Sequence, residues 1–134
     1  MNPKLNAPLT PISWGELIDK ITILEIKERN ITSQSAILNI RRELSFLSQI
    51  LKDSSAENLI SKQKDLLFAV NQKLWIVEDD IRDKEFNKEF DQQFIDLARS
   101  VYRLNDERAS IKKEINQLLE SEIVEEKSYK DFGS

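Results

Sequence analysis

The fold of this chain is decided by residues 13–29, which read SWGELIDKITILEIKER. The stretch opens with a capping box, in which the Ser13 hydroxyl can accept from the Glu16 amide while the Glu16 side chain reaches back. We therefore predict a helix from Trp14 to about Arg29. Its apolar residues recur at the spacing of one helix face: Leu17, Ile18, Ile21 and Leu24.

The same reasoning predicts three more helices. A second helix follows the short link 31–33, with apolar residues every three or four positions. A third should run from about Ala56 to Glu85 behind a capping box at Ser54, and a fourth should follow the cap Asp91. The chain has only two glycines, and its three prolines lie within the first eleven residues, so tight hairpins have little to form from. The predicted fold is all-α, an antiparallel helical bundle of four main helices.

The 134 residues indicate a single domain with two different ends. Residues 1–11 hold every proline and show no periodicity, which is typical of an extended N-terminal arm. Residues 12–121 should form the helical-bundle domain. Residues 122–134 are charged and aperiodic, so we expect a loose, flexible C-terminal tail.

Composition removes several classes of function. The chain has neither Cys nor His, which excludes thiolate and imidazole chemistry and the usual zinc sites. The scarcity of glycine excludes phosphate-binding loops that need close backbone approach. A net charge of −4 argues against nucleic acid as a partner. There is no apolar run of membrane-spanning length and no signal-peptide pattern, so we predict no membrane segment and a cytoplasmic protein.

Charged and amide side chains interrupt the apolar stripes of three of the four helices. An ionised group inside a bundle costs several kcal/mol unless it is paired or bound to a metal. Carboxylates from two helices could share Mg²⁺, while basic and amide groups of the fourth helix could bind an anionic ligand. The candidate metal ligands are Glu25, Glu28 and Glu78, and the candidate ligand-binding residues are Asn105, Arg108, Lys112 and Asn116.

A second interpretation of these residues stays open, in which the inner acids and bases form ion pairs between helices. The same helical wheel places Glu16 and Asp19 on the outward side of the first helix. On the third helix, Phe68 and Trp75 lie off the main apolar stripe. They predict a second apolar face, which either forms a homodimer contact or packs under an overlying helix.

Three blocks of the sequence carry a likeness to known proteins. They read PISWGELIDKITILEIK (residues 11–27), LWxxED (residues 74–79) and NDxRAxIKxEIN (residues 105–116). In these blocks the chain resembles a family of small uncharacterised helical proteins from bacteria and phages, a domain of unknown function sometimes encoded near surface-polysaccharide genes. The resemblance spans about residues 11–130, and it implies a cellular context but no activity.

A further likeness concerns only part of the polar set. Glu25 and Glu28 are similar to the Glu-x-x-Glu pair with which the all-α nucleotide pyrophosphohydrolases hold Mg²⁺. The second pair of those enzymes, Glu-x-x-Asp, has no counterpart, since Glu78 is followed three residues later by Ile81. The comparison is therefore an analogy of fold class and residue type.

Two hypotheses for function follow, and whether the chain is an enzyme stays open between them. The preferred one is a non-catalytic interaction or accessory protein, with a role in surface-polysaccharide metabolism implied by the resemblance. The alternative is Mg²⁺-dependent binding or hydrolysis of a phosphorylated small molecule, such as a nucleotide or nucleotide sugar, at the carboxylate, Arg and Lys residues between the helices.

Overall fold

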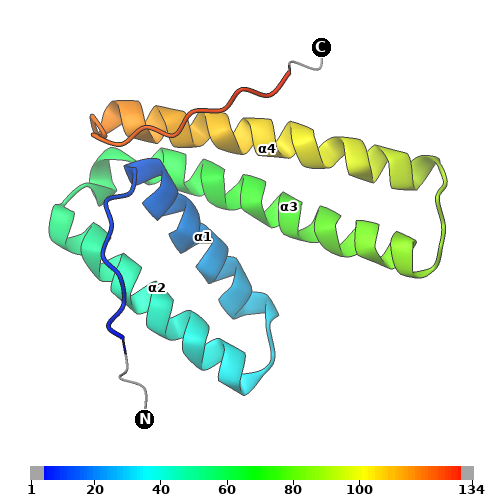
Figure 1. Cartoon of the computed structure of the whole chain (residues 1–134), viewed down its shortest axis with the longest axis horizontal. Coiled ribbons are helices and arrows are strands. Elements are labelled where there is room, and N and C mark those ends of the chain that lie inside the picture. The colour runs from blue at the N-terminus through cyan, green and yellow to red at the C-terminus, as the bar shows by residue number, and fades with distance from the viewer. Residues whose placement is uncertain (1–4, 131–134) are drawn as a thin grey trace.

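The computed structural model describes residues 5–130, which contain four long helices, one short 3-10 helix and no strand. The elements are α1 (Trp14–Asn30), α2 (Gln34–Ser54), the 3-10 helix η1 (Glu57–Leu59), α3 (Ser61–Phe86) and α4 (Gln92–Leu118). Figure 1 shows them as two antiparallel helical hairpins, so the predicted all-α bundle is confirmed. No helix in this part of the chain is long and apolar enough to cross a membrane.

Two of the predicted helix starts are confirmed by their caps. Helix α1 begins at Trp14, and the Glu16 amide donates to the Ser13 hydroxyl over 3.1 Å. At the start of α4, the Phe94 amide donates to the Asp91 carboxylate over 3.0 Å. Each cap satisfies an amide that has no partner inside its own helix.

The predicted start of the third helix is wrong. Ser54 is the last residue of α2, and its hydroxyl donates to the Leu51 carbonyl over 2.6 Å instead of capping a new helix. Ser55 then adopts a left-handed conformation, with φ of 61°, which ends α2. The chain passes through η1 before α3 begins at Ser61.

Helix α1 is the central element of the fold. It packs against α2, α3 and α4, whereas α2 packs mainly against α1 and η1. Because three helices contact α1, its buried residues extend well beyond the main apolar stripe and include Asp19, Thr22 and Ile26. The apolar core lies at the end of the molecule where all the helices meet, and consists of Leu17, Ile18, Ile21, Leu51, Ala56, Ile60, Leu67, Val70, Ile111 and Ile115.

The α3–α4 hairpin extends well past the other two helices. Figure 1 shows the second half of α3 and the first half of α4 standing clear of α1 and α2. We call residues 72–110 the distal hairpin. None of its residues is buried, while the buried residues of α3 and α4 all lie outside it, within residues 67–71 and 111–116. The molecule therefore has a packed half and a half without a core.

The segments outside the helices follow the predicted arm and tail. Residues 5–13 and 124–130 have no helix or turn, and Figure 1 shows the C-terminal segment running along α4. Residues 1–4 of the arm and 131–134 of the tail lie outside the described part of the chain. The domain limits at residues 12 and 121 stay predictions.

Candidate functional site

The start of α1 is held by the end of α4. The Gly15 amide donates to the Asn116 side-chain oxygen over 2.7 Å, and the Trp14 amide donates to the Ser121 hydroxyl over 3.3 Å. These amides would otherwise be unpaired at a helix N-terminus. The sequence after α4 thus completes the cap of a helix about one hundred residues earlier.

Gly15 is required by the close approach of these two helices. A Cβ atom at this position would lie 2.6 Å from the Lys112 carbonyl oxygen and 3.1 Å from the Asn116 side-chain oxygen. Both distances are shorter than ordinary contacts, and the first is to backbone that cannot rotate away. A glycine here lets α1 and α4 touch through their backbones.

One turn further along α1, Asp19 lies at the centre of a buried polar network. Its carboxylate is 1% exposed and accepts two hydrogen bonds from the Arg108 guanidinium, one of them 2.9 Å from Nε. The Asn71 amide donates to Asp19 over 2.9 Å and to the Thr22 hydroxyl over 2.9 Å, and that hydroxyl donates to the Asp19 carbonyl. The network therefore joins α1 to both α3 and α4.

Lys112 forms the second half of this network. Its ammonium lies 2.7 Å from a Glu16 carboxylate oxygen, 3.1 Å from Glu125 in the tail and 3.9 Å from Asp19. We call the five charged residues the charged cluster: Glu16, Asp19, Arg108, Lys112 and Glu125. With three acids and two bases, the charged cluster is close to neutral.

The charged cluster holds its basic groups in the protonated state. Burial by itself would lower the pKa of Lys112, but hydrogen bonds to Glu16 and Glu125 and the charge of Asp19 together raise it above the usual value. The hydrogen bond to Asp19 raises the pKa of Arg108. Both cations are thus engaged by carboxylates of the same chain.

An open cleft lies beside the charged cluster, between α1, α3 and α4. Its volume is about 540 Å³, and Arg108 lies in its wall together with Asn71 and Trp75. Basic and acidic side chains both contribute to the remaining wall, and the full lining is Ile23, Lys27, Asn71, Leu74, Trp75, Glu78, Asp79, Arg82, Asn105 and Arg108.

The three sequence blocks that meet around this network match a known protein family. Residues 9–133 match the family of unknown function DUF6165. The chain is a member of DUF6165. No curated protein and no solved structure matches the chain.

The four candidate ligand-binding residues of this DUF6165 protein face inward, as the stripe of the fourth helix indicated. Lys112 and Asn116 are buried and Arg108 is half-buried, and all three contact α1. Asn105 accepts a hydrogen bond from Arg108 over 3.3 Å. The structure brings these residues together, and each is engaged by another residue of the protein. Their role in ligand binding stays a prediction.

The structure does not bring the three candidate metal ligands together. Glu28 accepts from Arg41 of α2 over 3.3 Å, and Glu78 pairs with Arg82 over 3.5 Å. Glu25 has one buried carboxylate oxygen with no hydrogen-bond partner among residues 5–130. Within those residues, no three acidic side chains form a group that could hold a metal ion.

The wheel was wrong about Asp19, which is the most buried charged residue in the described chain. Glu16 is half-buried: one carboxylate oxygen accepts from Lys112, and the other lies 3.9 Å from the Lys20 ammonium at the surface. Sequence reasoning also missed Thr22, Asn71 and Glu125. A usable signal existed for the burial of Asp19, because Ile23 and Ile26 lie opposite the main apolar stripe of α1.

Proposed function

We propose that this DUF6165 protein is a non-catalytic interaction protein of the cytoplasm, in which the packed half fixes the shape and the distal hairpin binds a partner. The observation that carries the proposal is the absence of any buried residue between positions 72 and 110. The gene context implied by the family resemblance extends the proposal to an accessory role in surface-polysaccharide metabolism.

The composition of the distal hairpin is typical of a helix pair whose apolar surface packs against a further element. It holds large apolar residues that stay exposed, such as Ile76 at 53% and Ile95 at 46%, beside half-buried ones. Most helical stability in proteins comes from packing an apolar face, and two helices alone can cover only part of their own faces. A partner would remove the remaining apolar surface from water, at about 25 cal/mol per Å².

The pairing of the charged cluster also supports a non-catalytic role. Catalytic and metal-binding carboxylates need a free face toward the substrate or the ion. Here Asp19 accepts three hydrogen bonds from Arg108 and Asn71, and Lys112 is held among three carboxylates. These contacts hold α1 against α3 and α4, which is a structural role.

The proposal is tested by the size of the complex that the protein forms in an extract of its own cells. A tagged wild-type chain should elute well above the 15.7 kDa of one chain, and the Ile76→Ser/Ile95→Ser variant should elute near it. The matched control is Leu38→Ser/Phe46→Ser, which removes exposed apolar side chains from α2. Elution of the wild type as a monomer, or an equal loss in the control, would overturn the proposal.

The alternative of Mg²⁺-dependent phosphate binding draws on two observations, the buried unpaired oxygen of Glu25 and the cleft beside Arg108. It is tested by thermal melts with millimolar Mg²⁺ or Mn²⁺ and a panel of nucleotides and nucleotide sugars. A ligand at about 100 times its dissociation constant adds roughly 2.7 kcal/mol to the free energy of unfolding. A metal-dependent rise that Glu25→Gln abolishes would replace the interaction proposal with this one.

A further inference from the structure

We infer that the partner of the distal hairpin is a second copy of this chain, packed antiparallel so that the tip of each hairpin lies against the middle of the other. The inference rests on the proposed function, because it names the partner of the same surface. It adds an orientation and a set of charged contacts to that proposal.

An apolar seam runs along the distal hairpin. Side chains of both helices stay half-buried along its length: Leu74, Trp75, Val77 and Ile81 on α3, with Phe94, Leu97, Val101 and Leu104 on α4. In the packed half, α1 lies over the same two helices, and apolar side chains such as Leu67 and Val70 on α3 and Ile115 on α4 are buried. A second hairpin in the corresponding place would give each helix two neighbours, the arrangement of a four-helix bundle.

Positive and negative charges are separated along the distal hairpin. The tip, residues 78–96, holds eight acidic and three basic residues, a net charge of −5. The middle consists of residues 72–77 and 97–105, and it holds Lys73, Arg99 and Arg103 with no acidic residue, a net charge of +3. Because α3 and α4 are antiparallel, these segments lie at the same level of the hairpin.

This pattern selects one occupant and one orientation. Parallel packing of two copies would place tip against tip, with strong repulsion between like charges. Antiparallel packing places the negative tip of each copy against the positive middle of the other, twice, as a two-fold interface requires. The hairpin thus presents both the negative and the positive surface that an antiparallel dimer needs.

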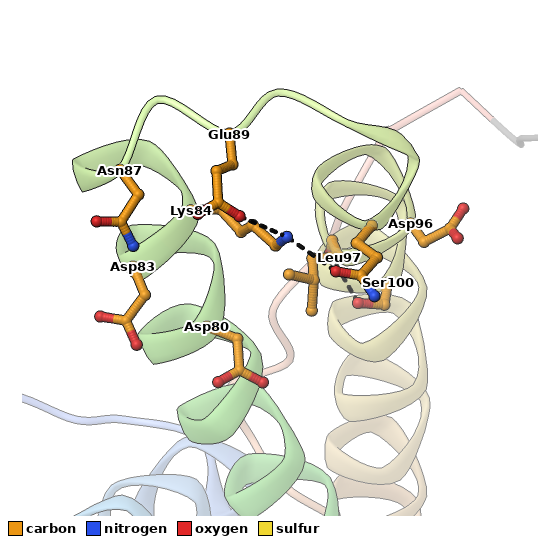
Figure 2. A pocket seen from close by; sticks show the side chains of 9 residues that line it. Asp80, Asp83, Lys84, Asn87, Glu89, Asp96, Leu97 and Ser100 are labelled. Atoms are coloured by element: carbon orange, nitrogen blue, oxygen red, sulfur yellow. Dashed lines mark hydrogen bonds and ion pairs between the residues drawn. The ribbon is translucent and has the colours of Figure 1, made fainter.

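The tip also offers a concave surface of the required sign. A pocket of about 580 Å³ lies between the end of α3 and the start of α4, and Figure 2 shows its side chains. Its one cation, Lys84, is held by Glu89 and Asp91 at 3.0 Å each. Within residues 5–130, the ion pairs of the tip join Arg82 to Glu78 and Lys84 to Glu89 and Asp91. Asp80 and Asp83, which line the pocket, belong to none of them, so their charges are available to a guanidinium from the middle of a second copy.

The inference is tested on the purified chain by sedimentation equilibrium at low salt, across a wide range of concentration. The wild type should reach about twice the mass of one chain. Arg99→Glu/Arg103→Glu should weaken the dimer at least tenfold, because its middle becomes negative and faces a negative tip. Asp80→Lys/Asp83→Lys should weaken it to a smaller extent, because it leaves the tip only slightly negative.

The decisive measurement is a mixture of the two charge-reversed variants. In the mixed dimer, the unchanged negative tip of Arg99→Glu/Arg103→Glu faces the unchanged positive middle of Asp80→Lys/Asp83→Lys. The mixture should therefore associate more tightly than either variant alone. The matched control is Arg42→Glu/Lys52→Glu, which reverses two exposed charges on α2 and should dimerise like the wild type. Circular dichroism of each variant confirms that the helices remain.

Three results would overturn the inference. These are a monomeric wild type at every concentration, charge-reversed variants that dimerise like the wild type, and a mixture no tighter than the tighter of its components. The outcome is separable from the proposed function. A purified monomer that still enters a large complex in extract would refute the second copy and leave the interaction role standing, while a monomer in both would refute both.

Discussion

Replacing Asp19 by Asn tests whether the charged cluster holds the packed half together. The substitution keeps the shape of the side chain and removes its charge. Asp19 is 1% exposed, and it accepts two hydrogen bonds from Arg108 and one from Asn71. After the change, the guanidinium of Arg108 loses its carboxylate and stays half-buried. An amide group also cannot accept all three hydrogen bonds in this geometry.

The expected cost is about 3 kcal/mol in the free energy of unfolding. Removing one partner of a buried ion pair costs roughly 3–5 kcal/mol, and the lower end applies because water can reach Arg108. Against a total of roughly 5–15 kcal/mol for a domain, this is a large fraction. For a chain of this size, the midpoint of thermal unfolding should fall by roughly 10 °C.

The assay is urea unfolding followed by circular dichroism, for Asp19→Asn, for Arg108→Met and for the double variant. The two changes should not add, because each single change leaves the other group unpaired and the double change leaves neither. A coupling energy of about 1–3 kcal/mol is expected. Additive effects, or a loss below about 0.5 kcal/mol for Asp19→Asn, would show that the ion pair does not hold α1 to α4.

Three further predictions concern the same region. Gly15→Ala should cost about 1–3 kcal/mol in a thermal melt, because its Cβ would meet the Lys112 carbonyl at 2.6 Å and force α1 away from α4. The folded-state pKa of Lys112 is raised, so its contribution is complete below the unfolded pKa of about 10.4 and is lost as the pH rises through the folded value. The stability difference between wild type and Lys112→Met, measured by urea unfolding from pH 7 to 11, should therefore stay constant to about pH 10 and shrink above it. Glu125→Gln should cost less than about 1 kcal/mol by the same method, because this carboxylate is half-exposed and Glu16 holds Lys112 more closely.

The helices were predictable because their signals are local. The caps at Ser13 and Asp91 are side chains that bond amides three residues further on, and the sequence shows both partners. The start of α3 was not predictable in this way. Ser54 and Glu57 have the letters of a capping box, but the hydroxyl of Ser54 bonds the preceding turn instead. Local spacing alone does not decide between these two partners.

Of the candidate site, only the residues that α4 contributes were predictable from the sequence. On α4, the polar residues interrupt a clear apolar stripe, and Arg108, Lys112 and Asn116 do point inward to α1. Their partners Asp19 and Glu16 were expected at the surface. The contribution of Glu125 depends on the path of the tail across α4, which has no periodic signal in the sequence.

The error at Asp19 has a physical cause in the position of α1. A helical wheel assumes that a helix has one neighbour and one outward side, but α1 is surrounded by three helices. Its sequence contained the correction, because Ile23 and Ile26 lie opposite the main stripe, and a helix that is apolar all round is a buried helix. A carboxylate on such a helix needs a cation from a neighbouring helix. The inward-facing Arg108 and Lys112 were the cations of α4 that had no acidic partner on their own helix. Asp19 lies among apolar residues on the supposed outer side of a central helix. In such a helix, an acid of this kind therefore predicts the position of the charged cluster better than the glutamates in the main stripe do.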